Sequence, residues 1–241
     1  ADIMGRVSSC PVLRGQYLAT RQSEVELKGK SMFDDTEVAN HYANGRLAEA
    51  IWAGVQDMGL TRESITVDDL AAVDEFHIGG RKASADLLEQ LGLSSNHHVL
   101  DIGSGLGGTA RFLVDNFGCR VSGIDLTAEF VETAKVLCSW VGLSERVDLY
   151  CGSALAMPFE GSGFDAAIML HVGMNIQDKA GLFAEVHRVL RPGAAFAVYD
   201  IMRQSADPLV YPVPWAEVPD ISFLGTHEEY RTALIEAGFE I

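Results

Sequence analysis

Apolar positions along most of the chain follow two alternating patterns. Short runs of mainly apolar residues predict buried strands at 97–102, 120–125, 146–152, 164–172 and 194–201. Helical spacing of apolar residues predicts helices at 127–141, 178–190 and 228–237, the second of them stopped by Pro192-Gly193. Strands that alternate with helices are typical of a parallel sheet covered on both faces. We therefore predict an α/β fold with a Rossmann-like, doubly wound and mainly parallel sheet.

Helical periodicity also precedes this alternation. Apolar residues at helical spacing predict helices over 37–58 and 81–91. We expect residues 32–92 to form an N-terminal helical lid and residues 93–241 to form the sheet domain, with a proline-rich lid insertion at about 203–224. Residues 1–31 lack clean periodicity and carry a net charge of +2, against −18 for residues 32–241. They are expected to be a leader or a disordered tail.

Charge and composition exclude several classes of protein. The 241 residues carry a formal charge of −16, and no cluster of lysine and arginine is visible, so a nucleic-acid partner is not expected. No apolar stretch approaches the ~18 residues of a membrane span. The cysteines show neither a CxxC pair nor a disulfide framework, which is typical of a reducing, cytoplasmic setting; they are Cys10, Cys119, Cys138 and Cys151.

Four glycines lie within Gly103–Gly108, between a predicted strand and a predicted helix. A glycine turn at this place lets backbone amides approach a ligand beyond the strand ends. Asp101 ends the strand, and Asp125 ends the next strand, 22 residues after Gly103. An acid in the second position can accept hydrogen bonds from both hydroxyls of a ribose. The pattern therefore predicts a nucleoside-containing ligand, against the alternative of a plain tight turn.

The type of nucleoside ligand is less strongly specified. Gly103, Gly105 and Gly108 have the spacing of a dinucleotide site, in which pyrophosphate lies over a helix N-terminus. A carboxylate at Asp101 would repel pyrophosphate but suits an ammonium group or the surroundings of a sulfonium. A nicotinamide-dependent oxidoreductase stays open as the alternative.

Four stretches resemble the successive motifs of class I S-adenosylmethionine-dependent methyltransferases: "VLDIGSGLGGTARFL", "GIDLTAEFVETAK", "GSALAMPFEGSGFDAAI" and "EVHRVLRPGAAFAVYDIM". The resemblance covers about residue 75 to the last residue. More closely, "DEFHIGG" and "LHVGMNIQDK" are similar to the small-molecule group with sarcosine/dimethylglycine and phosphoethanolamine N-methyltransferases. The resemblance implies S-adenosylmethionine as cofactor, S-adenosylhomocysteine as its product, and no metal.

The resemblance also implies roles for individual residues. Asp125 would hold the ribose, Leu126 would pack on the adenine, and His171 would lie next to the methyl group. Ser153 departs from the family pattern, which often has an aspartate there to accept from the adenine amino group. The remaining cofactor residues are the methionine-binding Asp101, Gly103, Ser104 and Gly105, and Ala154 and Leu155 at the edge of the adenine.

Methyl transfer from a sulfonium is an in-line displacement that needs a base only if the nucleophile must lose a proton. His171 is the candidate base, or else it only orients the substrate. His77 is a candidate lid contact, or else a packed histidine. Four further histidines are expected at strand edges or helix surfaces: His97, His98, His187 and His227.

Substrate contacts are expected from outside the sheet. Tyr211 and Trp215 can face a cationic amine, Arg203 can bind a carboxylate, and Met174 follows the fourth predicted strand. Core packing, or a hydrophobic plug for a lid, is the alternative. We predict methyl transfer to a small-molecule acceptor, an amine first. The alternatives are O- or C-methyl transfer to a natural-product or phenolic acceptor and, in a different class, a non-catalytic nucleoside-binding protein.

The resembled family continues after the last predicted helix with two more strands that cover the edge of the sheet. Here Phe239, Glu240 and Ile241 only enter a strand, so these C-terminal strands of the fold are apparently missing. The strand at 194–200 would then expose unpaired backbone groups. Either the chain is shorter than the natural protein, or another segment covers this edge, for which residues 1–31 are a candidate, or a second copy of the chain does so in a homodimer.

Overall fold

In the computed structural model of the chain, residues 12–21, 46–74 and 77–241 are described. Their strands form one seven-stranded sheet in the order β4-β3-β2-β5-β6-β1-β7. The five strands from β4 to β6 run parallel, and β1 is antiparallel to both of its neighbours. The strands are β1 Val12–Arg21, β2 His98–Ile102, β3 Arg120–Asp125, β4 Val147–Cys151, β5 Phe164–Leu170, β6 Leu190–Arg203 and β7 Phe239–Glu240.

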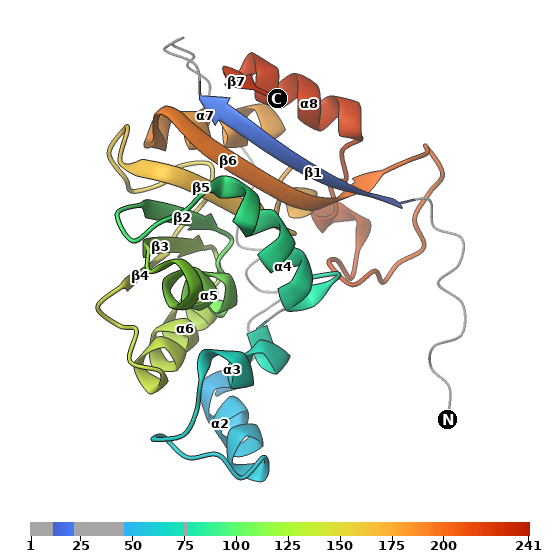
Figure 1. Cartoon of the computed structure of the whole chain (residues 1–241). Helices are drawn as coiled ribbons and strands as arrows, with labels where there is room; N and C mark the ends of the chain where they lie inside the picture. Colours follow the sequence, from blue (N-terminus) through green and yellow to red (C-terminus); the bar gives the residue numbers. More distant parts are fainter. Residues whose placement is uncertain (1–11, 22–45, 75–76) are drawn as a thin grey trace.

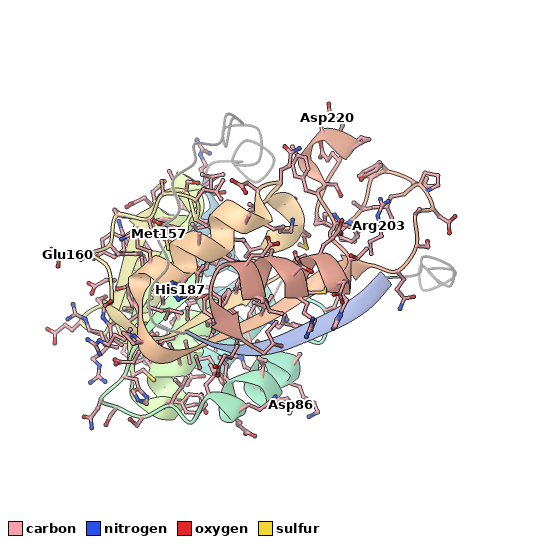
Figure 2. The ribbon with its side chains drawn as sticks, turned by 90° about the horizontal axis from the view of Figure 1, so that it is seen from above. Asp86, Met157, Glu160, His187, Arg203 and Asp220 are labelled. Carbon is pink, nitrogen blue, oxygen red and sulfur yellow. The ribbon has the colours of Figure 1, made fainter. Side chains whose placement is uncertain are left out.

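Helices cover both faces of this sheet, as the alternating pattern predicted (Figure 1). One face packs against α4, α5 and α6, and the other against α7 and α8. Viewed from above in Figure 2, α4, which carries Asp86, lies on the opposite side of β1 from α7 and α8. The helices are α2 Leu47–Asp57, α3 Val67–Asp74, α4 Gly80–Leu88, α5 Gly108–Phe117, α6 Ala128–Trp140, α7 Lys179–Val189 and α8 His227–Glu236; 3₁₀ turns are η1 Glu89–Leu91, η2 Gly173–Asn175 and η3 Pro219–Ile221.

Successive residues of β6 pack into opposite cores because side chains alternate along a strand. Phe196 and Val198 join the core under α7 and α8. Ala197 and Tyr199 join the core under α4, α5 and α6. The strand is therefore buried on both faces, which explains its nearly continuous apolar sequence.

Strand β1 corrects the expectation of a leader or tail over residues 1–31. Its residues pair with β6 from Val12↔Arg203 to Thr20↔Ala195, and with β7 at Thr20↔Glu240 and Arg21↔Phe239. Backbone groups along the edge of β6, which would otherwise be unpaired, form the ladder with residues 12–21. The proposal that the first residues cover the β6 edge is thus confirmed for 12–21, whereas 1–11 and 22–31 lie outside the described residues.

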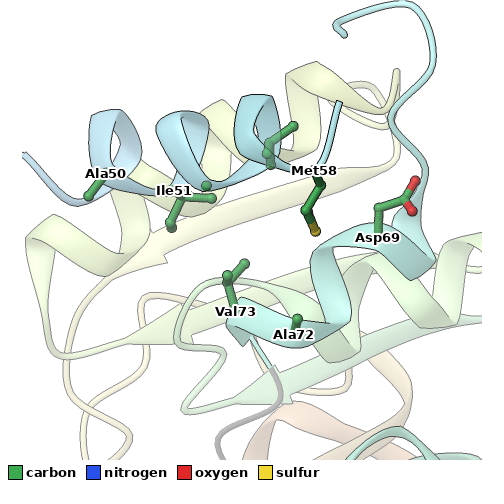
Figure 3. Close-up of a pocket in the computed structure, with 8 residues that line it drawn as sticks. Ala50, Ile51, Met58, Asp69, Ala72 and Val73 are labelled. Carbon is green, nitrogen blue, oxygen red and sulfur yellow. The ribbon is translucent and has the colours of Figure 1, made fainter. Parts of the chain in front are cut away.

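The lid helices differ from their predicted bounds. Of the predicted helix 37–58, α2 covers 47–57, and residues 37–45 lie outside the described part. The sequence pattern did not predict α3, because eight residues give too few turns for a clear period. Between α2 and α3 lies an apolar groove of about 340 Å³, lined in part by Ile51, Val55 and Val73 (Figure 3).

Aromatic packing attaches α2 to the sheet domain. The Trp52 and Trp140 rings meet edge to face with centroids 5.2 Å apart. The Arg62 guanidinium lies over both, 3.5 Å from the Trp52 ring centroid and 4.0 Å from that of Trp140. Such cation–π contacts contribute about 0.5–2 kcal/mol each.

The predicted helix 178–190 is found as α7 at nearly these bounds, but the strand expected to begin at 194 begins earlier. The helix ends at Val189, and β6 begins at Leu190 and includes Pro192 and Gly193. Leu190 pairs with Phe164 but Ala195 with Ala166, so an irregularity in the register absorbs the proline and glycine. Within the described ranges, no helix is long and apolar enough to cross a membrane.

Candidate active site

The turn after β2 needs glycine at two positions for different reasons. Gly103 and Gly105 have φ angles of 68° and 51°, in the left-handed region that favours glycine. A Cβ at Gly103 would lie 2.1 Å from Cγ2 of Val172, so no side chain fits there. A Cβ at Gly105 would meet no atom of the described residues within 4 Å. The turn is therefore packed at Gly103 and open at Gly105, where a ligand can approach the backbone.

Asp125, at the end of β3, contacts this turn directly. Its Oδ2 accepts the amide of Gly105 at 2.8 Å, and its Oδ1 accepts the amide of Thr127 at 2.9 Å. Each carboxylate oxygen has a second lone pair for a ligand hydroxyl. Burial is the largest influence on this group and raises the pKa of Asp125. The structure thus brings Asp125 and the glycine turn together, as the sequence predicted.

Asp101 and Ser104 lie deep beside the turn. Asp101 is 2% exposed, and β2 places it between Gly123 of β3 and Ile168 of β5. Ser104 is buried, and its amide and that of Gly103 donate to the carbonyl of Ile124, at 3.1 and 2.8 Å. These hydrogen bonds hold the turn against the end of β3, so they fix its position relative to Asp125.

The residues expected around the adenine lie at the ends of β3 and β4. The Cys151 thiol donates to the carbonyl of Leu126 at 3.6 Å and so joins the two loops. The amide of Leu155 donates to the Ser153 hydroxyl at 3.2 Å. Ala154 and Leu155 pack against the core. A hydroxyl that accepts one bond still has a donor and a second lone pair, so Ser153 can serve in place of the family's aspartate.

The two candidate catalytic histidines, His77 and His171, lie close together although they are 94 residues apart in the sequence. Their ring centroids lie 5.8 Å apart, and the Tyr199 ring lies 5.2 Å from His171 and 6.2 Å from His77. The amide of His171 donates to the carbonyl of Tyr199 at 2.8 Å, and His77 Nε2 shares a 2.8 Å hydrogen bond with Ser84 Oγ. His171 has a φ of 55°, in the left-handed region that few non-glycine residues adopt.

The expected substrate residues are distributed differently. Met174 and Trp215 are 5% and 7% exposed and form an apolar cluster with Ile201, against which Tyr211 packs. Trp215 Nε1 donates to Ser222 Oγ at 3.0 Å, so the indole is fully accommodated within the insertion. Arg203 is the last residue of β6 (Figure 2) and does not belong to this apolar cluster. This packing agrees with the alternative of an apolar plug, and the substrate roles stay predictions.

A buried polar cluster lies next to η2, and the sequence did not predict it. Asp200 is fully buried, accepts the Tyr230 hydroxyl at 2.7 Å, and burial raises the pKa of Asp200 to about 6. Burial likewise lowers the pKa of Lys179 to about 8, and Lys179 Nζ donates to the carbonyls of Phe223, at 2.8 Å, and Ile176. Lys179 thereby ties the end of the insertion to the segment after η2.

A buried ion pair attaches the lid beside the glycine turn. Asp74, the last residue of α3, pairs with Arg111 of α5, and both side chains are completely buried. Arg111 Nη1 also donates to the carbonyl of Leu106, within the turn, at 2.7 Å. Removing one partner of such a pair costs about 3–5 kcal/mol. Both residues lie in motifs quoted above, but neither motif predicted their pairing.

The histidine His187 needs a correction. The sequence placed it at a strand edge or helix surface, but it is 7% exposed. Its ring packs on Phe239 of β7 at 5.4 Å. The strand that covers it comes from the far end of the chain, so its local sequence carries no sign of this burial.

Comparison with known proteins agrees with this geometry. A methyltransferase domain is matched over residues 100–198. Sterol 24-C-methyltransferase ERG6B of Gibberella zeae is 32% identical over 114 residues, 47% of this chain and 30% of that protein. Methyltransferase GfsG of Streptomyces halstedii is 29% identical over 175 residues, 71% of this chain and 61% of that protein. The chain thus spans less than two thirds of these relatives.

Among solved structures, the [4+2]-cyclase SpnF superposes with a TM-score of 0.59 at 26% identity, covering 66% of this chain and 57% of that one. The cofactor of the matched family is S-adenosylmethionine, and the residues present fit it: an open backbone at Gly105, a carboxylate at the end of β3, and half-buried apolar Leu126 and Leu155. A methyltransferase domain thus matches residues 100–198 of this chain, and the glycine turn and the strand order of the described sheet agree with the fold of class I S-adenosylmethionine-dependent methyltransferases.

Proposed function

We propose that the chain binds S-adenosylmethionine at the ends of β2, β3 and β4 and catalyses transfer of its methyl group to a small-molecule acceptor. One observation carries this proposal. The glycine turn packs on Val172, the residue that directly follows His171, so the cofactor turn and the histidine pair adjoin. A methyl group held by the turn would therefore face the two histidines.

The cofactor-binding roles follow the geometry of the turn. Asp101, Gly103, Ser104 and Gly105 would hold the methionine part, and Asp125 would accept from the ribose hydroxyls. The adenine would lie between Leu126 and the loop that contains Ser153, Ala154 and Leu155. When bound, S-adenosylmethionine supplies a methyl group already activated by its sulfonium, so the protein needs to add alignment rather than activation.

The protein's contribution is alignment, removal of a proton and exclusion of water. Alignment of a donor and a nucleophile can be worth about 7–11 kcal/mol of the barrier. His171, next to the turn, is positioned to orient the nucleophile and to take its proton, which contributes about 10²–10⁴-fold where a base is needed. His77 closes the other side of the same space from the lid.

For the acceptor we propose a small amine first, because two stretches of the sequence resemble the small-molecule N-methyltransferase group. A carbon acceptor is the second candidate, because the relative from Gibberella zeae is named a sterol 24-C-methyltransferase. A protein with a related fold, SpnF, is named a [4+2]-cyclase. The fold alone therefore does not decide the chemistry.

Methyl-labelled S-adenosylmethionine incubated with panels of small amines, phenols and apolar alkenes tests the proposal directly. We expect labelled product and S-adenosylhomocysteine, and fragmentation of the product locates the methyl on nitrogen, oxygen or carbon. The Asp125→Ala variant serves as a control that should bind the cofactor more weakly than the wild type. Cofactor binding by the wild-type chain without transfer to any acceptor would instead support a nucleoside-binding protein.

A further inference from the structure

Tyr199 occupies a distinctive place between the sheet and the lid. It is 2% exposed on β6, with its ring in the core under α4, α5 and α6. Its hydroxyl donates to the carbonyl of Ile78 at 2.9 Å, across 121 residues of sequence. Ile78 lies in the short connection between α3 and α4. The hydroxyl therefore links the centre of the sheet to the lid connection.

The connection is shaped to accept this bond. The Ile78 side chain is 43% exposed, whereas its carbonyl meets the buried Tyr199 hydroxyl. Gly79 has a φ of 93°, and a Cβ there would lie 2.8 Å from the Cβ of Ala83 and 3.7 Å from the Tyr199 hydroxyl. Glycine is needed here because both the backbone angle and the close approach exclude a side chain.

Tyr199 contacts the segments that carry both histidines. Its carbonyl accepts the amide of His171 at 2.8 Å, and its hydroxyl holds Ile78, the neighbour of His77. The ring centroids of the two histidines lie 5.2 and 6.2 Å from its own. Ser84 completes the arrangement by bonding His77 Nε2. One sheet residue thus sets the distance between a histidine of the lid and a histidine of the sheet.

We propose that Tyr199 is a positioning residue: its hydroxyl latches the lid connection to β6 and so holds His77 opposite His171. The latch itself is a property of the fold. Its effect on turnover rests on the proposed methyl transfer.

Tyr199→Phe tests the latch, because phenylalanine keeps the ring and removes only the hydroxyl. Amide hydrogen exchange should accelerate about fivefold at Gly80, whose amide donates to the carbonyl of His77 at 3.1 Å. Fivefold corresponds to the loss of one net hydrogen bond. Tyr230→Phe is the matched control: it removes another buried tyrosine hydroxyl, bonded to Asp200 on the opposite face, and should leave exchange at Gly80 unchanged.

Turnover provides the second readout. In Tyr199→Phe, kcat should fall about fivefold or more while the dissociation constant of S-adenosylmethionine stays unchanged, because the glycine turn and Asp125 are untouched. Unchanged exchange at Gly80, or an equal acceleration in Tyr230→Phe, would overturn the latch. Faster exchange without a change in kcat would overturn the positioning role. If the wild-type chain transfers no methyl group, the proposed function fails, and the exchange comparison still decides the latch.

Discussion

Alanine substitution of the two glycines in the turn after β2 should separate folding from cofactor binding. In Gly103→Ala the new Cβ would lie 2.1 and 2.9 Å from the two methyl carbons of Val172, at a φ of 68°. The left-handed angle costs about 1–2 kcal/mol, and forcing an extra carbon into a packed site costs about 1–3 kcal/mol more. We expect the free energy of unfolding to fall by about 2–5 kcal/mol.

Gly105→Ala should behave differently. The φ of 51° carries the same backbone cost of about 1–2 kcal/mol, but among the described residues the new Cβ meets no atom within 4 Å. The methyl would instead enter the space assigned to the cofactor. We expect a small loss of stability together with a weakening of S-adenosylmethionine binding by more than about tenfold, or about 1.4 kcal/mol.

Gly142→Ala is the matched control for both variants. It has a φ of 72° and lies just past the end of α6, and a new Cβ there also meets no atom within 4 Å in the described part of the chain. It should lose about as much stability as Gly105→Ala and bind the cofactor like the wild type.

Urea denaturation and titration calorimetry measure the two quantities separately. If Gly105→Ala binds S-adenosylmethionine as tightly as Gly142→Ala does, the assignment of the open side of the turn to the cofactor is refuted. If Gly103→Ala is no less stable than Gly142→Ala, the contact with Val172 does not constrain the turn.

Three further predictions concern single side chains. Asp125→Ala should weaken S-adenosylmethionine binding by about 1.5–3 kcal/mol, the worth of hydrogen bonds to a charged acceptor; unchanged affinity in calorimetry would argue against the ribose role. His171→Ala should lower kcat more than cofactor affinity, by about 10²–10⁴-fold if it is a base, and a loss below about tenfold leaves only orientation. Because Asp200 binds its proton more tightly when folded, with a pKa of about 6 against 3.8, stability should fall as pH rises between these values. Urea denaturation of Asp200→Asn should lack this fall of about 3 kcal/mol, and an identical pH dependence in both proteins would contradict the burial argument.

The fold was predictable wherever strand and helix follow each other closely. The strand ending at Asp125 and the helix after it were expected nearly at their observed bounds, because each buries a locally periodic face. Strand β1 was not, since its partner β6 lies far along the chain. The early start of β6, before Pro192-Gly193, was missed because a register irregularity, which only pairing with β5 reveals, accommodates both residues.

The candidate site divides in the same way. The glycine turn and Asp125 were found because the pattern of turn and acid lies within one stretch of sequence. Tyr199 and Lys179 were missed because their partners lie 121 and 44 residues away. Nothing in a tyrosine inside an apolar strand, or in a lysine at the start of a helix, indicates a bond to a distant carbonyl.

The position of β1 bears on the order in which the sheet is assembled. Val12 and Arg203 pair across 191 residues, and Thr20 and Glu240 across 220. Contacts so distant in sequence form slowly, because the loop entropy is lost before the pairing is gained. The parallel strands β2 to β6 need no contribution from β1, so we expect them to associate first during folding. Strand β1, which precedes the parallel strands in the chain, is then expected to pair after them, and β7 pairs only once β1 is in place.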